Sequence, residues 1–300
     1  MKFREVFRYE FGYRLRSPST WSYAAFLFLV MVWGLAATAE GTDAVKVNAP
    51  QEIANGFVLF GGLIGLLVSA ALFGDAAIRD AAAGMDPLLY TTRLRKAEYL
   101  GGRYLAALAI NAVVVLAIPL GFWVATVTVV EADAVGPNRL AAYAQPLLLF
   151  LLPNLVLAGA ILFTIGALAR RAIPVYLGAI GVFIGYTVAA NNWSYIESPI
   201  LSALADPFGI NALLAMNRYL TPSELETRLI GFPALLVWNR VLWLAVAAGV
   251  LAVLHRRFRF AHADGGGGRR KGRRAMVEAM IETPARSPSL ISKRRPHIRT

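Results

Sequence analysis

The sequence predicts an all-α membrane protein with six transmembrane helices. Of its 300 residues, 57% are hydrophobic and only 16% are charged, whereas soluble domains carry roughly 25% charged residues. The charged residues leave long uncharged windows between them, which is the second observation. The third is that the basic residues gather on one side of those windows, and this predicts how the helices are oriented.

The uncharged windows reach or exceed the roughly 18–20 apolar residues that cross a bilayer as a helix. Five windows cover residues 21–39, 53–74, 104–130, 140–169 and 172–196, and a weaker sixth covers 234–254. Helices are expected because backbone polar groups in hydrocarbon must be satisfied within the segment itself.

The basic residues predict the topology. The few assigned to the outer side are Lys46, Arg139, Arg218, Arg228 and Arg240. The other 25 of the 30 fall on the opposite side, which the positive-inside rule assigns to the cytoplasm. We therefore expect both termini in the cytoplasm and the chain in a bacterial plasma (inner) membrane. The net charge of +12 is mostly a result of this topology, with some attraction to the lipid bilayer, so no nucleic-acid partner is expected.

Residues 1–20 predict an amphipathic helix lying along the inner membrane surface. Its apolar stripe consists of Phe3, Phe7, Phe11 and Leu15. Glu10 and Arg14 are spaced so that they can pair, and Pro18 stops the helix. The alternative is a simple positively charged anchor for the first membrane helix.

Residues 21–260 form the predicted transmembrane domain, and residues 261–300 a basic, Gly/Arg/Pro-rich tail that we expect to be disordered and cytoplasmic. The tail begins with a glycine linker at 265–268 and a basic block at 269–274. Residues 37–39 have the form of a signal-peptidase site. The long apolar run before them favours an uncleaved anchor.

The segment 191–233, between the fifth and sixth windows, predicts two or three short helices at the outer leaflet. Asp206 followed by Pro207 fits an N-cap and the first position of a helix. Thr221, Pro222 and Glu224 form a capping box with proline at the same position.

Three polar side chains within the windows are candidates for a functional or a bridging role. Arg240 is a candidate functional residue because intramembrane charges are costly. It lies near the outer end of its window, so its side chain could instead extend to the membrane interface. Asn111 and Asn154 are expected to bridge helices by hydrogen bonds, with a place along a pathway as the alternative.

Two glycine pairs have the spacing that allows helices to pack closely. Gly61 and Gly65 lie in the second window, and Gly181 and Gly185 in the fifth. Such pairs fit close packing within the chain or across a dimer.

Several kinds of chemistry are missing from the sequence. It has no cysteine, and no Gly-Lys pair of the kind that a phosphate-binding loop contains. The only histidines are His255, His262 and His297, and no His-Glu-x-x-His motif is present. We therefore expect a chain that is not an enzyme, holds no cofactor or metal, and depends on another protein for energy.

A polar segment between the second and third windows predicts a short cytoplasmic helix. Gly84 suits the C-cap of the preceding helix, and Asp86 with Pro87 suits a new helix start. The residues after this start are Leu88, Leu89, Tyr90, Thr91, Thr92, Arg93, Arg95 and Lys96. Exposed leucines on a capped helix suggest a docking site for a partner. An interfacial turn whose leucines enter the headgroup layer is the alternative.

This segment resembles the coupling loop of the ABC-2 type transporter permeases. Residues that match the family's order are Gly84, Leu88, Leu89, Thr91 or Thr92, Arg95, Lys96, Leu100 and Gly101, whereas Arg93 stands where many members have proline. The resemblance implies that this loop enters a cleft of a separate ABC ATPase subunit, which binds ATP and Mg. Asp86 and Pro87 would begin the helix, and Leu88 and Leu89 would fill the cleft. It also implies a homodimer or a heterodimer with a second permease half.

A closer resemblance is to the N-terminal half of permeases fused to an M1-type aminopeptidase domain. It covers about residues 1–260 and rests on the motifs at 14–18, 48–50, 73–75, 86–92 and 206–209. No peptidase motif is present, so no peptidase activity is implied for this chain.

The sequence thus predicts a permease subunit that couples ATP hydrolysis by a partner to the movement of a substrate. The nearly charge-free windows suit a lipid-like or amphipathic substrate. The alternative is a membrane scaffold that anchors a partner protein without transporting anything.

Overall fold

A computed structural model describes residues 2–38, 45–85, 94–193 and 198–258. All regular elements in these ranges are helices, as predicted. The contacts divide the chain into two units, Met1–Phe260 and Ala261–Thr300. The tail predicted from residue 261 and the predicted coupling residues Asp86, Pro87, Leu88, Leu89, Tyr90, Thr91, Thr92 and Arg93 lie outside the described residues.

The N-terminal half of the chain contains α1 (Lys2–Leu15), α2 (Pro18–Thr38), α3 (Pro50–Gly56), η1 (Phe57–Ile64), α4 (Gly65–Ala82), α6 (Lys96–Val115) and α7 (Ala117–Thr128). The C-terminal half contains η2 (Ala132–Ala134), α8 (Leu140–Pro146), η3 (Leu147–Leu151), α9 (Leu152–Ala169), α10 (Ala172–Trp193), α11 (Pro199–Ala205), α12 (Ile210–Asn217), α13 (Pro222–Thr227) and α14 (Ala234–Arg257). Of the short η elements, η1 and η3 are π-helical and η2 is a 3₁₀ turn.

Several helices are long and apolar enough to cross a membrane. Among the described residues they are Pro18–Thr38, Lys96–Thr128, Leu140–Ala169, Ala172–Asn192 and Ala234–Arg257. The second predicted window forms a bent pair instead, Pro50–Gly62 and Gly65–Ala82, with an angle of 44° between its halves. The described residues therefore contain five candidate spans, or six if the bent pair is one span.

The π-helical elements η1 and η3 pack against each other, and Gly61 makes their close approach possible. A Cβ atom on Gly61 would lie 2.1 Å from Leu151 Cδ2. Gly65 lies at the edge of a cavity of about 20 Å³ beside this contact. Gly181 and Gly185 face open space on α10, so a role for this second pair in a dimer stays a prediction.

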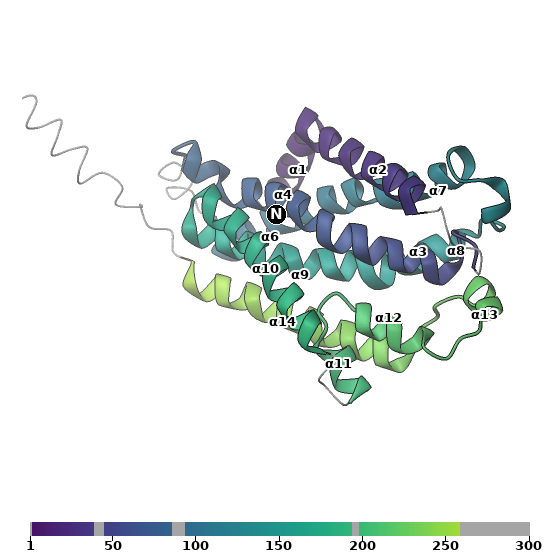
Figure 1. Cartoon of the computed structure of the whole chain (residues 1–300). Coiled ribbons are helices and arrows are strands. Elements are labelled where there is room, and N and C mark those ends of the chain that lie inside the picture. Colours follow the sequence, from purple (N-terminus) through teal and green to yellow (C-terminus); the bar gives the residue numbers. More distant parts are fainter. Residues whose placement is uncertain (1, 39–44, 86–93, 194–197, 259–300) are drawn as a thin grey trace, which may run out of the picture. The chain divides into compact units, whose positions relative to one another are not determined.

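Aromatic side chains fill two parts of the core. In one, Phe122 packs edge-on against Phe57 and Tyr143. In the other, Tyr104 packs against Phe73 and Phe163. Helices α4 and α14 both pack on α9, and α2 packs on α7 (Figure 1).

Helix α1 packs on the bundle in addition to whatever contact it makes with a membrane. It lies on α6, where Gly102 leaves room for it: a Cβ atom there would lie 2.9 Å from Val6 Cγ1 and 3.3 Å from the carbonyl oxygen of Phe3. The inward face of α1 buries Glu10 and Arg14. These buried charges have partners on other helices, and the placement of α1 along the inner membrane surface stays a prediction.

The segment before α14 contains the short helices α11, α12 and α13, as predicted. The predicted capping box is confirmed: Thr221 N–H donates to Glu224 Oε2 (2.8 Å), and Glu224 N–H donates to Thr221 Oγ1 (3.4 Å). The predicted helix start at Asp206 and Pro207 is wrong. Helix α12 begins at Ile210 after Gly209, which has a positive φ of 82°.

Candidate functional site

The predicted coupling segment, residues 86–93, follows α4, and the end of α4 has a defined backbone geometry. Gly84 has a positive φ of 66° and its N–H donates to the carbonyl oxygen of Ala81 (3.2 Å). The N–H of Met85 donates to the carbonyl oxygen of Asp80 (2.9 Å). Together these bonds form a Schellman motif, in which glycine is favoured because it adopts positive φ without strain. The predicted C-cap role of Gly84 is confirmed.

The chain returns to the bundle at the start of α6. Arg95 is the N-cap residue and Lys96 is the first residue of the helix. The carboxylate of Glu98 accepts the backbone N–H of Arg95 at 3.1 Å, which satisfies a donor that the helix itself leaves free. Both ends of the connection between α4 and α6 therefore have defined backbone geometry.

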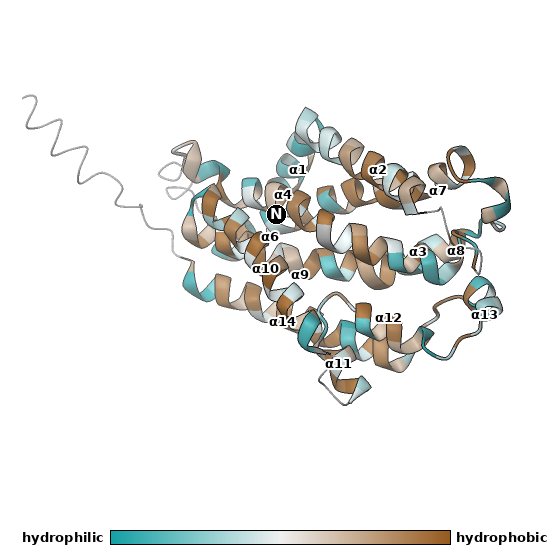
Figure 2. Ribbon diagram, in the orientation of Figure 1, coloured by the Kyte–Doolittle hydropathy of each residue, from teal (hydrophilic) through white to brown (hydrophobic). Residues whose placement is uncertain are grey.

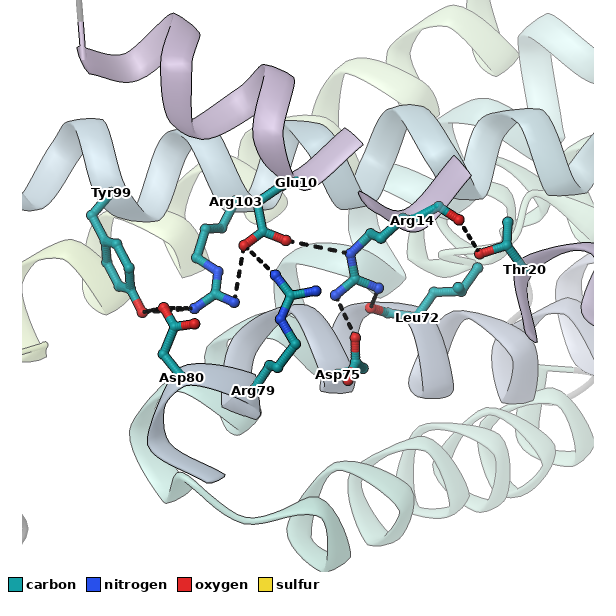
Figure 3. Close-up of polar contacts among 9 residues, drawn as sticks. All are labelled: Glu10, Arg14, Thr20, Leu72, Asp75, Arg79, Asp80, Tyr99 and Arg103. Carbon is teal, nitrogen blue, oxygen red and sulfur yellow. Dashed lines mark hydrogen bonds and ion pairs between the residues drawn. The ribbon is translucent and has the colours of Figure 1, made fainter. Parts of the chain in front are cut away.

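A group of charged residues, which we call the charged cluster, joins these two helix ends to α1 (Figure 3). It consists of Glu10 and Arg14 from α1, Asp75, Arg79 and Asp80 from α4, and Arg103 from α6.

Glu10 is at the centre of the charged cluster. Its Oε1 atom lies 2.6 Å from Arg79 Nη2 and 3.1 Å from Arg103 Nη2. One carboxylate of α1 therefore contacts both α4 and α6. Arg103 also pairs with Asp80, so α4 and α6 are linked directly as well.

Arg14 makes the second link between α1 and α4. Its Nη2 atom donates to Asp75 Oδ2 at 2.7 Å, and its Nη1 atom donates to the carbonyl oxygen of Leu72 at 3.2 Å. Burial lowers the pKa of the Arg14 guanidinium below its ordinary value, although the charges of Asp75 and Glu10 act in the opposite direction. Thr20 at the start of α2 donates to the carbonyl oxygen of Arg14 (2.8 Å), which joins the next helix to the cluster.

The charged cluster is balanced and largely buried. It pairs three guanidinium groups with three carboxylates. Glu10, Arg14 and Arg103 are each less than 5% exposed. Burial of charges is tolerated where each has an opposite partner and further hydrogen bonds. The tyrosines at its edge add to it: the hydroxyl of Tyr99 donates to Asp80 Oδ2 (2.9 Å), and Arg79 lies 4.2 Å from the ring centroid of Tyr13.

A cavity of about 540 Å³ lies beside the charged cluster. Tyr9 and Tyr13 of α1 line it together with Met85 and Leu94, the described residues that flank the coupling segment. Among the described residues, no three His, Asp or Glu side chains are close enough together to hold a metal ion. The arrangement is suited to transmitting movement between helices, because it joins three of them by short ion pairs.

A second buried polar group, the Arg240 group, consists of Asn154, Asp206, Asn239 and Arg240. Arg240 is only 6% exposed, with its Nη1 atom 2.8 Å from Asn154 Oδ1 and its Nε atom 2.9 Å from Asn239 Oδ1. The interpretation that Arg240 extends to the membrane interface is therefore wrong. Its guanidinium points into the protein because amide oxygens of α9 and α14 accept its donors.

The segment between α11 and α12, which lies outside the candidate spans, completes the Arg240 group. Asp206 accepts the N–H groups of Phe208 (2.9 Å) and Asn211 (2.7 Å). Burial raises the pKa of the Asp206 carboxyl above its ordinary value, although these backbone hydrogen bonds and the charge of Arg240 act in the opposite direction. Asn154 Nδ2 also donates to the carbonyl oxygen of Phe208 (3.1 Å), so Asn154 does bridge elements. Asn111 lies apart from this group and bridges α6 to α4 by donating to Ser69 Oγ (3.0 Å).

The sequence interpretation identified Glu10 and Arg14 as a pair and Gly84, Arg95 and Lys96 as parts of the coupling loop. It missed that α1 contributes to the same site as α4 and α6. The available signal was the set of charged residues that lie between the second and third windows: Asp75, Arg79, Asp80 and Arg103. Acidic and basic residues next to spans can pair with one another when the ends of those spans pack together.

No protein-family model matches the chain, and a search of curated proteins found no match either.

Proposed function

We propose that this chain is the membrane-spanning permease subunit of an ABC-2 type transporter. In this proposal, a separate ATPase subunit binds and hydrolyses ATP, and residues 86–93 of the chain contact that subunit. The observation that carries the proposal is the position of the charged cluster. It joins α1 to the last two turns of α4 and the first two turns of α6, the helices that precede and follow the coupling segment.

The mechanism depends on how force would pass from the coupling segment to the spans. A displacement of residues 86–93 acts on the end of α4 and the start of α6 together. Glu10 and Arg14 carry the same displacement into α1, and the bond from Thr20 to Arg14 carries it to α2. Salt-bridge networks of this kind let packed helices move together as one body.

The bent pair of α3–η1 and α4 suits a movement of this kind. Its two halves meet at 44° near Gly61 and Gly65, and π-helical segments often occur at functional sites. Movement of α4 would be accommodated at this bend. In the proposal the substrate is lipid-like or amphipathic, because the spans carry few charges, and two permease halves form a dimer around its path.

Copurification tests the partner. The full chain is extracted in mild detergent, and the proteins that accompany it are identified by mass spectrometry. We expect an ATPase with a phosphate-binding loop, and we expect Leu88→Asp with Leu89→Asp to remove it. Tyr219→Asp is the matched control, because Tyr219 is 83% exposed in the segment between α12 and α13, which the proposal places on the outer side. If a different protein is recovered and lost in the same variant, the chain is a scaffold.

ATPase coupling tests the charged cluster. In proteoliposomes that contain both subunits, we expect Glu10→Gln to leave the ATPase bound but to weaken the dependence of its activity on the permease. Glu5→Gln on the exposed side of α1 is the control. An unchanged ATPase response in a folded Glu10→Gln protein would contradict the proposed path from the coupling segment to α1.

A further inference from the structure

Residues of α1 and of the start of α2 line an open groove of about 570 Å³ where the two helices meet. Its lining residues are Arg8, Tyr9, Gly12, Tyr13, Arg16, Ser17 and Pro18. No carboxylate is among them. Tyr9 and Tyr13 separate the groove from the cavity beside the charged cluster, since they line both. In Figure 2 the ribbon of α1 is more hydrophilic than the ribbon of α2.

We propose that this groove binds the phosphate headgroup of an anionic phospholipid. The inference does not depend on the proposed transport function. It requires that α2 crosses a membrane and that α1 lies on the side whose leaflet carries the anionic lipids.

Unpaired positive charge is the first argument. The arginines of the charged cluster all have carboxylate partners within 4 Å. Arg8 and Arg16 have none among the described residues, and both are exposed. Two guanidinium groups on one groove without an acid favour an anion, and guanidinium groups bind phosphate through paired hydrogen bonds.

The position relative to the membrane is the second argument. Helix α2 is a candidate span that begins at Pro18, at the edge of the groove. The phosphates of the adjacent leaflet lie at the level where such a span begins, and the cytoplasmic leaflet carries the anionic lipids. A lipid phosphate is therefore the anion present at the highest local concentration beside Arg8 and Arg16.

Exposed aromatic rings are the third argument. Tyr9 is 69% exposed, Tyr13 is 52% exposed, and their rings stack with centroids 6.4 Å apart. Trp21, at the start of α2, is also 52% exposed, and its indole N–H donates to the carbonyl oxygen of Leu15 (2.9 Å). Exposed Tyr and Trp side chains are enriched at the headgroup level of membranes, where the ring contacts acyl chains and the polar atom contacts water.

The corner itself is rigid enough to form a site. Ser17 N–H and Thr20 Oγ1 both donate to the carbonyl oxygen of Arg14, at 3.0 and 2.8 Å. Gly12 leaves the floor of the groove open, because a Cβ atom there would have no heavy atom within 4 Å. A large side chain at this position would occupy the groove without disturbing the packing of α1.

Lipid titration with native mass spectrometry tests the proposal on the full purified chain. The probes are phosphatidylglycerol, phosphatidylcholine and inorganic phosphate. We expect phosphatidylglycerol to bind more tightly than phosphatidylcholine, and Arg8→Gln with Arg16→Gln to weaken it roughly 30-fold, because each basic residue near an anionic lipid contributes about a fivefold factor. Gly12→Trp should weaken binding to a similar extent while the charge of the chain is unchanged.

The matched control is Arg4→Gln with Arg257→Gln, which removes two exposed positive charges that do not line the groove. It should change binding by less than about twofold. The proposal is overturned if this control weakens binding as much as the groove variant, since the attraction is then general. It is also overturned if Gly12→Trp has no effect, if phosphatidylcholine binds equally, or if inorganic phosphate alone occupies the groove and phosphatidylglycerol does not displace it.

Discussion

The charged cluster and the Arg240 group both bury arginine, but they satisfy it differently. In the charged cluster, three guanidinium groups face three carboxylates. In the Arg240 group, the guanidinium donates to the amide oxygens of Asn154 and Asn239. Asp206 is also present, but backbone N–H groups occupy its carboxylate.

The difference follows from where each arginine lies along its helix. The charged cluster lies at the ends of spans, where α1 and the extension of α4 can supply carboxylates outside the hydrocarbon region. Arg240 lies within a candidate span, where a direct carboxylate partner would add the desolvation cost of a second charge. Neutral acceptors avoid that cost. Removal of one member should therefore lower the free energy of unfolding more in the charged cluster than in the Arg240 group.

The largest effect is expected for Glu10→Gln. The change leaves three arginines, two of them buried, opposite two carboxylates. Loss of one member of a buried ion pair costs about 3–5 kcal/mol. Unfolding in mixed micelles with increasing SDS measures the free energy of unfolding. Glu5→Gln, on the exposed face of the same helix, should change it by less than about 0.5 kcal/mol.

A smaller effect is expected for Arg240→Met. This change removes the charge and leaves two neutral amide oxygens without donors, which costs about 1–3 kcal/mol. The same unfolding measurement, with exposed Arg218→Met as control, checks the value. A loss of unfolding free energy as large as that of Glu10→Gln would contradict the proposed difference between the two groups. Neutral acceptors would then be as costly to leave unpaired as charges.

Gly209→Ala sharpens the account of the Arg240 group. Gly209 has a φ of 82°, and a Cβ atom there would lie 2.2 Å from Arg240 Nη2. The positive φ alone costs an alanine roughly 1–2 kcal/mol. The overlap adds to this cost while Arg240 is present, so Gly209→Ala should be less harmful in an Arg240→Met background. Strictly additive losses in the double variant would show that Arg240 is not held against Gly209.

The smallest effect is expected for the bond between Asn111 and Ser69. Both residues lie within helices that are candidate membrane spans, and Asn111 Nδ2 donates to Ser69 Oγ at 3.0 Å. Hydrogen bonds of this kind in membrane proteins contribute about 0.6 kcal/mol on average. A double-mutant cycle with Asn111→Ala and Ser69→Ala should give a coupling free energy of this size. A coupling free energy as large as the loss of unfolding free energy in Glu10→Gln would contradict the view that removal of a charged partner costs more than removal of a neutral one.

Much of the fold could be predicted because it depends on local properties of the chain. Five of the six predicted windows correspond to candidate spans, since the length of an apolar run is visible in the sequence. Gly84 and the Thr221 capping box were predictable for the same reason: each helix end is satisfied by residues within five positions. The bend between η1 and α4 was not, because it depends on the packing of η1 against η3.

The candidate site was predictable only in part. Residues 86–93 were identified from their pattern and resemblance, whereas the charged cluster depends on pairs that are far apart in the chain, such as Arg79 with Glu10. Asp206 shows the same limit. Its pattern fits an N-cap, but packing places it where it accepts N–H groups from the turn before α12.

The sequence by itself determined that this is an all-helical protein with several helices able to cross a membrane, because apolar length, charge placement and local caps are properties of short segments. Only the tertiary structure decided which face of α1 is buried, that Glu10 joins α4 to α6, and that Arg240 points inward to Asn154. The physical reason is that a buried charge needs a partner at hydrogen-bonding distance. Which residue provides that partner depends on how the helices pack.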